Sequence, residues 1–247
     1  MAVIRRYERK YLIDASLVDD ISASISAFCD LDPYHLNAQE GGYTIQSLYL
    51  DTPALDFYED KKARRLSRAK PRVRFYGEQP GDRVWLEIKR KVNGVVIKTR
   101  SKLPTADWPG LLDAPADSLS PAEAAFAAFV VGRGAIPVVH VRYQRLAFVS
   151  AIDDYARVTF DTALCSAPAQ GSPELVLPSS AFTPFDDPPG CTFPTSPVIL
   201  ELKCEANTPL WMIDLVRRFG LMETAFSKYC VGLDATQPPA PLFRLTR

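Results

Sequence analysis

The sequence is poor in histidine, has no closely spaced cysteine pair and contains no long apolar run. With two histidines among 247 residues, a zinc site built on imidazole ligands is not expected. The five cysteines are scattered and never form CxxC, which is typical of reduced thiols in a cytoplasmic protein. The longest apolar run, residues 124–131, is far shorter than the roughly 20 residues of a membrane span. The first residues run straight into Arg5 and Arg6 with no apolar stretch of the signal-peptide type, and we expect a cytoplasmic protein.

Net charge is absent as well. The 29 basic and 29 acidic residues cancel, whereas a nucleic-acid-binding domain is usually strongly basic, so no nucleic acid is expected as a partner. A disordered chain is excluded because 47% of the residues are hydrophobic. The phosphate-binding loop GxxxxGK[ST] does not occur, so any phosphate would have to be bound by side chains.

Capping signals predict a small number of helices. Ser120-Pro121-Ala122-Glu123 forms a capping box in front of an apolar run, and Gly132 follows that run as a natural stop. Pro directly after Thr is a further start signal. Helices are expected over residues 14–28, after Thr52-Pro53, over 124–131, and from Thr208-Pro209 to Gly220.

Most other segments alternate between apolar and polar residues, as strands do. Asn93-Gly94 is a hairpin signal between two of them. Eight prolines within residues 168–197 predict a long surface loop near 165–197. Strands are expected over residues 4–12, 43–51, 70–76, 83–92, 94–103, 138–148, 155–164 and 198–204.

The fold class that follows is α+β. No repeat or linker divides the chain, so we expect a single domain over residues 1–247, with about eight strands in an antiparallel β-barrel, or tunnel, and flanking helices. The sequence carries no signal for an oligomeric state.

The zero net charge conceals a strong local charge. Residues 61–102 hold 15 Lys and Arg against 3 acidic residues, so this segment carries +12 and the rest of the chain −12. A charged, solvated surface would be the ordinary explanation for a run of this kind. The alternation argues against it, because residues two apart in a strand share a face. The faces that collect charge hold Lys70, Arg72 and Arg74; Glu87, Lys89 and Lys91; Lys98, Arg100 and Lys102; Tyr143 and Arg145; Glu201 and Lys203; and Glu8 and Lys10.

A barrel would accommodate these like charges. Neighbouring strands of a flat sheet would oppose cation to cation, which destabilises a sheet. In a barrel the apolar face can turn outward under the helices and the charged face can line a wet lumen, wide enough with about eight strands for one ligand. A chain of phosphates is the ligand type that such a lining would bind.

Three glutamates stand two residues before a lysine inside this lining. In Glu8-Arg9-Lys10, Glu87-Ile88-Lys89 and Glu201-Leu202-Lys203, the spacing is compatible with three salt bridges along the strands. It is also compatible with carboxylates that gather a divalent ion while the lysines bind phosphates. A metal bound in this way would be Mg²⁺ or Mn²⁺.

The ordered set of motifs resembles the triphosphate tunnel metalloenzymes, and within them the VTC-type polyphosphate polymerase domain. The resemblance runs from residue 5 to about 235. It rests on Tyr7-Glu8-Arg9-Lys10-Tyr11, Ser47-Leu48-Tyr49-Leu50-Asp51-Thr52, Phe57-Tyr58, Lys70-Pro71-Arg72-Val73-Arg74-Phe75-Tyr76-Gly77, Trp85-Leu86-Glu87-Ile88-Lys89, Val96-Ile97-Lys98-Thr99-Arg100, Arg142-Tyr143-Gln144-Arg145, Arg157-Val158-Thr159-Phe160-Asp161, Ile199-Leu200-Glu201-Leu202-Lys203 and Phe226-Ser227-Lys228-Tyr229.

The resemblance implies an enzyme, a metal-dependent phosphotransferase that passes the γ-phosphate of ATP to a growing polyphosphate chain in a cationic tunnel. Its partners would be ATP and inorganic polyphosphate, and its cofactor Mn²⁺ or Mg²⁺, held by Glu201. The expected catalytic residues are Lys10, Arg72, Arg74, Lys89, Glu201 and Lys228. The expected phosphate- or nucleotide-binding residues are Glu8, Ser47, Tyr49, Lys70, Glu87, Lys91, Lys98, Arg100, Tyr143, Arg145, Lys203 and Ser227.

Two other functions remain open. Arg6 stands where the hydrolase branch has a further glutamate, which favours the polymerase over a triphosphate or tripolyphosphate hydrolase. The third hypothesis is a non-catalytic polyphosphate- or nucleotide-binding module, which could regulate a membrane-protein partner. We expect a form that resembles a bacterial stand-alone protein, without the phosphate-sensing and membrane-spanning domains of eukaryotic relatives.

Overall fold

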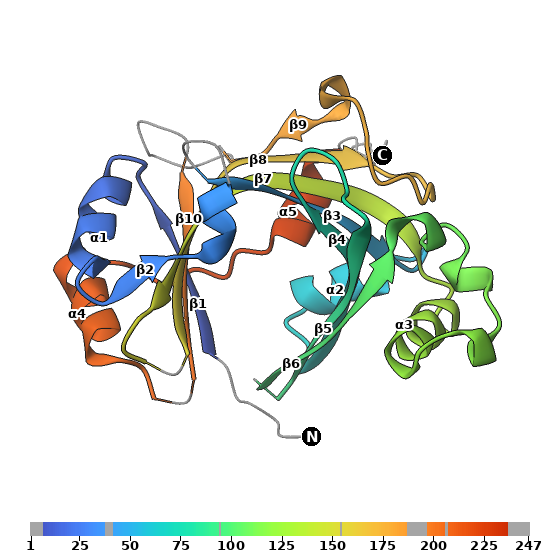
Figure 1. Ribbon diagram of the computed structural model, residues 1–247, viewed down its shortest axis with the longest axis horizontal. Coiled ribbons are helices and arrows are strands. Elements are labelled where there is room, and N and C mark those ends of the chain that lie inside the picture. The colour runs from blue at the N-terminus through green and yellow to red at the C-terminus, as the bar shows by residue number, and fades with distance from the viewer. Residues whose placement is uncertain are drawn as a thin grey trace, which may run out of the picture.

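A computed structural model describes residues 7–37, 42–93, 95–153, 155–186, 197–205 and 207–236. Its main element is one strongly curled antiparallel sheet (Figure 1), in which eight strands follow the order β1-β10-β8-β7-β3-β4-β5-β6 and the short strands β2 and β9 pair with β7 and β8. The bounds are β1 Tyr7–Ile13, β2 Cys29–Leu31, β3 Tyr43–Asp51, β4 Ser67–Tyr76, β5 Arg83–Val92, β6 Val95–Pro104, β7 Ile136–Ser150, β8 Ala156–Pro168, β9 Thr183–Pro184 and β10 Val198–Cys204.

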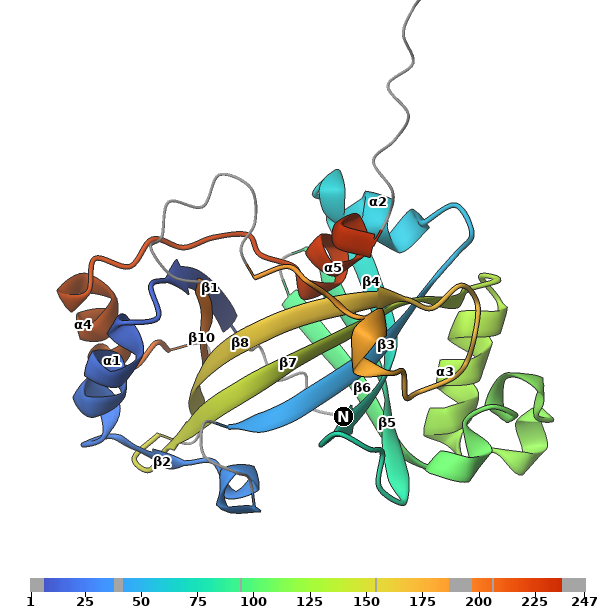
Figure 2. The ribbon, with the colours of Figure 1, turned by 90° about the horizontal axis from the view of Figure 1, so that it is seen from above.

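Helices flank the sheet in three places. Figure 2 shows α1 and α4 together at one side, α3 at the opposite side, and α2 beside α5 at the back. The bounds are α1 Leu17–Ile25, α2 Asp56–Lys62, α3 Pro121–Val131, α4 Leu210–Arg218 and α5 Lys228–Thr236. The described helices are all too short or too polar to span a bilayer.

Apolar residues on the outer face of the sheet hold α1, α3 and α4 in place. Val73, Leu86 and Ile88 on the convex side of β4 and β5 share a buried cluster with Phe126 and Phe129 of α3. A second cluster joins β1, β8 and β10 to α1 and α4. Burying these side chains outward leaves their charged neighbours, two residues apart on the other face, to line the concave side.

Helix α5 packs on the concave side, against β7 and β8. Gly232 makes this approach possible, because a Cβ there would lie 3.0 Å from Val141 Cγ2 and 3.2 Å from Ser166 Cβ. The Ser166 hydroxyl donates to the Gly232 carbonyl at 2.8 Å. Because α5 fills one end of the concave side, its first residues face the remaining open space.

The α+β class and the eight-stranded antiparallel sheet are confirmed. The sheet is curled into a half-barrel whose two edge strands, β1 and β6, have no backbone pairing with each other over their described residues. Side chains join the two ends of the sheet instead: Lys89 Nζ on β5 lies 2.7 Å from Glu8 Oε2 on β1.

Most predicted elements lie within a few residues of the observed ones. The strands over 43–51, 83–92 and 198–204 agree in both bounds. The capping box of Ser120 and Glu123 is present. The predicted surface loop contains the two-residue strand β9, and its part from 187 to 196, like Gly94 of the hairpin signal, lies outside the described residues.

Candidate functional site

The concave side of the sheet encloses a cavity of about 610 Å³. Its lining contains eleven Lys and Arg side chains but two carboxylates, a surplus of nine positive charges. Charges of one sign at this density repel one another in a space of low dielectric, so the cavity favours a polyanion. The basic residues that line it are Lys10, Lys70, Arg72, Arg74, Lys89, Lys98, Arg100, Arg145, Arg157, Lys203 and Lys228.

One group of cations surrounds Glu87, which is completely buried behind the cavity wall. Arg72 Nη2 lies 2.5 Å from Glu87 Oε2, Lys98 Nζ 2.6 Å from Oε1, and Arg100 Nε 3.0 Å from Oε1. Burial alone would raise the pKa of Glu87, but Arg72, Arg74 and Lys98 outweigh burial and hold it far below its usual range. The charged carboxylate fixes these cations in the cavity wall, where Arg72 and Arg100 also donate to the hydroxyls of Tyr49 and Tyr76.

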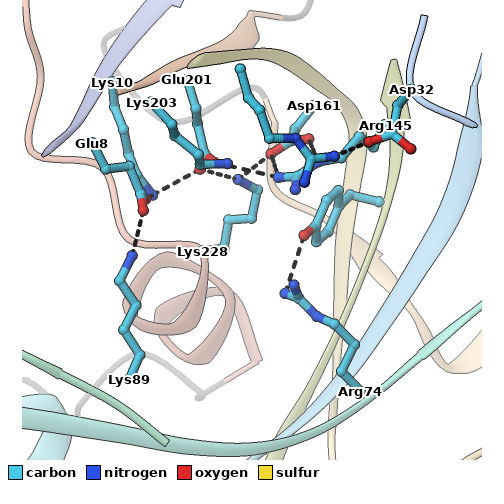
Figure 3. Close-up of polar contacts among 12 residues, drawn as sticks. Glu8, Lys10, Asp32, Arg74, Lys89, Arg145, Asp161, Glu201, Lys203 and Lys228 are labelled. Atoms are coloured by element: carbon cyan, nitrogen blue, oxygen red, sulfur yellow. Dashed lines mark hydrogen bonds and ion pairs between the residues drawn. The ribbon is translucent and has the colours of Figure 1, made fainter. Parts of the chain in front are cut away.

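A second group surrounds Glu201 on β10 (Figure 3). Lys10 Nζ and Lys228 Nζ each lie 3.0 Å from Glu201 Oε1, and Lys203 Nζ lies 2.6 Å from Oε2. Although burial raises the pKa of Glu201, Lys10, Lys203 and Lys228 hold it well below its usual value. Glu201 is thus the centre of a four-cation cluster completed by Arg145.

Asp161 supports the second group from behind. Its two oxygens each accept a hydrogen bond of 2.6 Å from the Arg145 guanidinium, and Lys228 Nζ lies 2.5 Å away. This bidentate pairing fixes the plane of the guanidinium. Arg145 and Lys228 are therefore held in position by one buried carboxylate while they point to Glu201 and the cavity.

Glu8 on β1 links the Glu201 group to Lys89 on β5 across the cavity. It accepts from Lys89 at 2.7 Å and lies 3.4 Å from Lys10 Nζ, as the dashed contacts in Figure 3 show. Register explains the arrangement: Lys10 pairs with Glu201 and Glu8 with Lys203 between β1 and β10, so each cation opposes a carboxylate rather than another cation.

The start of α5 contributes the last polar group. The Ser227 hydroxyl accepts from Cys230 N at 3.3 Å, as an N-cap does, and from Lys70 Nζ at 2.6 Å. Burial lowers the pKa of the Lys70 ammonium to about 7. Lys70 therefore gives up its proton more easily than an ordinary lysine as long as no anion lies beside it.

The structure brings most of the sequence-predicted residues to this cavity. Ser47, Glu87 and Lys91 do not line it. Ser47 accepts from Arg74 Nε at 3.1 Å behind the wall, whereas Lys91 stands near the end of the β5–β6 hairpin. The predicted residues in the lining are Glu8, Lys10, Tyr49, Lys70, Arg72, Arg74, Lys89, Lys98, Arg100, Tyr143, Arg145, Glu201, Lys203, Ser227 and Lys228.

Several residues of the site were not predicted from the sequence. Asp161 lies four residues after Arg157 on β8, so the two side chains share a face of the strand. This even spacing could have placed Asp161 inside the barrel. Arg157 also lines the cavity and forms an ion pair with the buried Asp32. Tyrosines make up most of the remainder, namely Tyr7, Tyr34, Tyr43, Tyr76, Tyr155 and Tyr229.

The three glutamates do not converge as a metal cage would require. Glu8 and Glu201 both contact Lys10, whereas Glu87 has its own cations on β4 and β6. Among the described residues, no three His, Cys, Asp or Glu side chains are placed to hold a metal together. Mg²⁺ is commonly held by one or two carboxylates and completed by substrate phosphates; Glu201, with Glu8 near it, fits that mode.

Solved structures that are similar to this one are very distant in sequence. A candidate adenylate cyclase from Vibrio parahaemolyticus has a TM-score of 0.50 at 11% identity, over 93% of this chain and 98% of that chain. A candidate adenylate cyclase from Bacillus halodurans has a TM-score of 0.46 at 12% identity, over 90% of this chain and 92% of that one. A search of curated proteins returned no match.

A comparison with protein families gives a match over nearly the whole chain. The VTC domain matches residues 5–237, a span that includes every strand of the sheet and every residue of the cavity lining. The curled antiparallel sheet with its inward-facing cations is the tunnel fold that the motifs predicted. The chain therefore belongs to the VTC domain family.

Proposed function

We propose that the protein is a metal-dependent polyphosphate polymerase that transfers the γ-phosphoryl group of ATP to the end of an inorganic polyphosphate chain. The bond between the β,γ-bridging oxygen and the γ-phosphorus breaks, its electron pair leaves with ADP, and a terminal polyphosphate oxygen forms the new bond. The observation that carries the proposal is the cavity lining, with eleven cations to two carboxylates. Phosphoryl transfer depends mainly on positioning and on neutralising charge.

The state of the lining carboxylates favours transfer over hydrolysis. Cations lower the pKa of Glu201 well below its usual value, so it is a poor base. A terminal phosphate oxygen is already ionised and needs no base, whereas an attacking water molecule gains from one. Lys70 could serve as a base when neutral, but phosphates beside it would raise its pKa and keep its proton in place.

Each part of the lining receives a role in this proposal. Arg145 and Lys228, oriented by Asp161, and the arginines of the Glu87 group bind phosphate oxygens. Tyr143, whose hydroxyl accepts from Arg74 Nη2 at 3.3 Å, and Ser227 hydrogen-bond them. Glu201 would hold Mn²⁺ or Mg²⁺, which when bound neutralises charge on the phosphates.

The direct test is to incubate the purified protein with ATP and Mn²⁺ or Mg²⁺ and to follow products by ³¹P NMR. The proposal expects ADP together with signals of internal phosphates in a chain. Release of inorganic phosphate from tripolyphosphate, without chain growth, would instead indicate a hydrolase. Tight binding of tripolyphosphate with no turnover under either condition would indicate a binding module.

Polyanion binding should weaken as the pH rises above 7. The free protein loses the Lys70 proton above its pKa of about 7, while a bound phosphate chain requires the charged form and must draw the proton back. The dissociation constant of inorganic tripolyphosphate, measured by calorimetry, should rise at least tenfold between about pH 7 and about pH 8.5, because burial also lowers the pKa of Lys98 to about 7 and that of Lys203 to about 8.

The matched control is Lys70→Arg, because a guanidinium stays protonated over this range. Its dissociation constant should depend less on pH than that of the wild type, and this comparison cancels the ionisation of tripolyphosphate itself. Equal pH profiles for both proteins would contradict the assignment to Lys70.

A further inference from the structure

Three tyrosines from separate segments meet at one end of the cavity. The ring centroids of Tyr34 and Tyr76 are 5.3 Å apart with 16° between the planes, and Tyr43 lies 6.1 Å from each of them. We call Tyr34, Tyr43 and Tyr76 the tyrosine cluster. All three line the cavity, so the cluster forms an aromatic section of a wall that is otherwise cationic.

The tyrosine cluster directly adjoins the phosphate-binding cations. The Tyr76 hydroxyl accepts from Arg100 Nη2 at 2.9 Å, and Tyr43 pairs with Arg145 between β3 and β7. Tyr76 follows Arg74 by two residues on the same face of β4, a step of about 7 Å along a strand. The aromatic surface thus lies directly beside the row of phosphate-binding cations.

Tyr34 is both anchored and accessible. The Asp32 carboxylate accepts from the Tyr34 backbone N–H at 2.9 Å and is itself paired with Arg157. Tyr34 is nevertheless 54% exposed, whereas Asp32 is 2% exposed. A large aromatic ring held at a cavity rim in this way presents surface on which another ring can stack.

We propose that the tyrosine cluster is the stacking platform for the nucleobase of the nucleoside triphosphate whose phosphates enter the cationic part of the cavity. This rests on the proposed function in one respect, that the phosphoryl donor is a nucleotide. Stacking uses the π-face that every base has, so the platform selects nucleotides over inorganic phosphate chains and discriminates little among the four bases.

The experiment compares two ligands under conditions without turnover. Dissociation constants for ATP and for inorganic tripolyphosphate are measured by calorimetry on the full chain in the presence of EDTA. Tyr34→Ala should weaken ATP binding about tenfold and leave tripolyphosphate binding unchanged. Tyr34→Phe, which keeps the ring, should bind both ligands as the wild type does, and UTP and GTP should behave as ATP does.

A second variant gives a signal that is independent of affinity. In Tyr34→Trp, ATP should quench the added fluorescence relative to the wild type, and tripolyphosphate should not. Unchanged ATP affinity in Tyr34→Ala, or an equal loss for both ligands, would overturn the platform, as would equal quenching by both. These results leave the polymerase proposal intact, since its failure would be the absence of polyphosphate in the turnover assay.

Discussion

Replacing both Arg72 and Arg74 by alanine is expected to weaken binding of inorganic tripolyphosphate by a factor of about 10² to 10⁴. Both guanidinium groups line the cavity and are fixed from behind, Arg72 by Glu87 at 2.5 Å and Arg74 by Ser47 at 3.1 Å. A hydrogen bond to a charged group contributes about 1.5–3 kcal/mol, and two such contacts account for the range. The affinity should also depend less on salt.

The matched control removes two arginines from another part of the surface. Arg217→Ala with Arg218→Ala on α4 changes the net charge by the same amount, at exposed positions outside the cavity lining. Calorimetric titrations at several salt concentrations should separate the two double variants. If the Arg72 and Arg74 double variant is folded, as judged by thermal unfolding, and binds tripolyphosphate normally, the assignment of the cavity as the phosphate site is wrong.

The second large effect concerns Glu201. Glu201→Gln keeps the shape of the side chain but removes the negative charge that Lys10, Lys203 and Lys228 surround. We expect turnover with ATP to fall by about 10² or more, the scale of losing a group that stabilises the transition state by its charge. Tripolyphosphate binding should be retained or become tighter, because the cavity gains a net positive charge.

Two further measurements define what Glu201 does. Binding of Mn²⁺ in the presence of tripolyphosphate, followed by electron paramagnetic resonance, should weaken in Glu201→Gln and remain normal in Glu174→Gln, an exposed control. Normal turnover in Glu201→Gln would refute the metal assignment. Loss of tripolyphosphate binding together with turnover would instead make Glu201 an organiser of the cations.

The alternation of apolar and charged residues along the strands predicted most of the fold. Strands β5 and β10 could be bounded because their apolar residues fill an outer core while the charged ones alternate inward, a pattern that a single strand already displays. Helix α5 could not be bounded in this way: it is nine residues long and contains Gly232, so it has no clear apolar stripe. Its position depends on contacts with β7 and β8, which no local pattern encodes.

The site, too, contains residues that strand alternation predicted and residues that it did not. Cations such as Lys89 on β5 and Arg100 on β6 each follow or precede another charged residue by two positions in the same strand. The face that they share with that residue could therefore be predicted from the sequence. In one of the two interpretations of the Glu-x-Lys spacing, Glu87 and Glu201 meet at a metal ion. Strand order instead places β5 and β10 far apart in the sheet, and each glutamate is neutralised by its own neighbours. Tyr34 belongs to no alternating segment, and only the folded chain brings it beside Tyr76.

The unpaired edges of the sheet have a consequence for a polymeric product. Strands β1 and β6 are not joined by backbone hydrogen bonds along their described residues, and the Lys89–Glu8 ion pair that links the two ends of the sheet is partly exposed. Such a contact contributes about 1 kcal/mol or less and can open without unfolding any strand. In the proposed polymerase, a long phosphate chain would not need to be threaded through a closed ring. It could enter or leave sideways through this seam, and the processivity of synthesis would then depend on how often the seam opens.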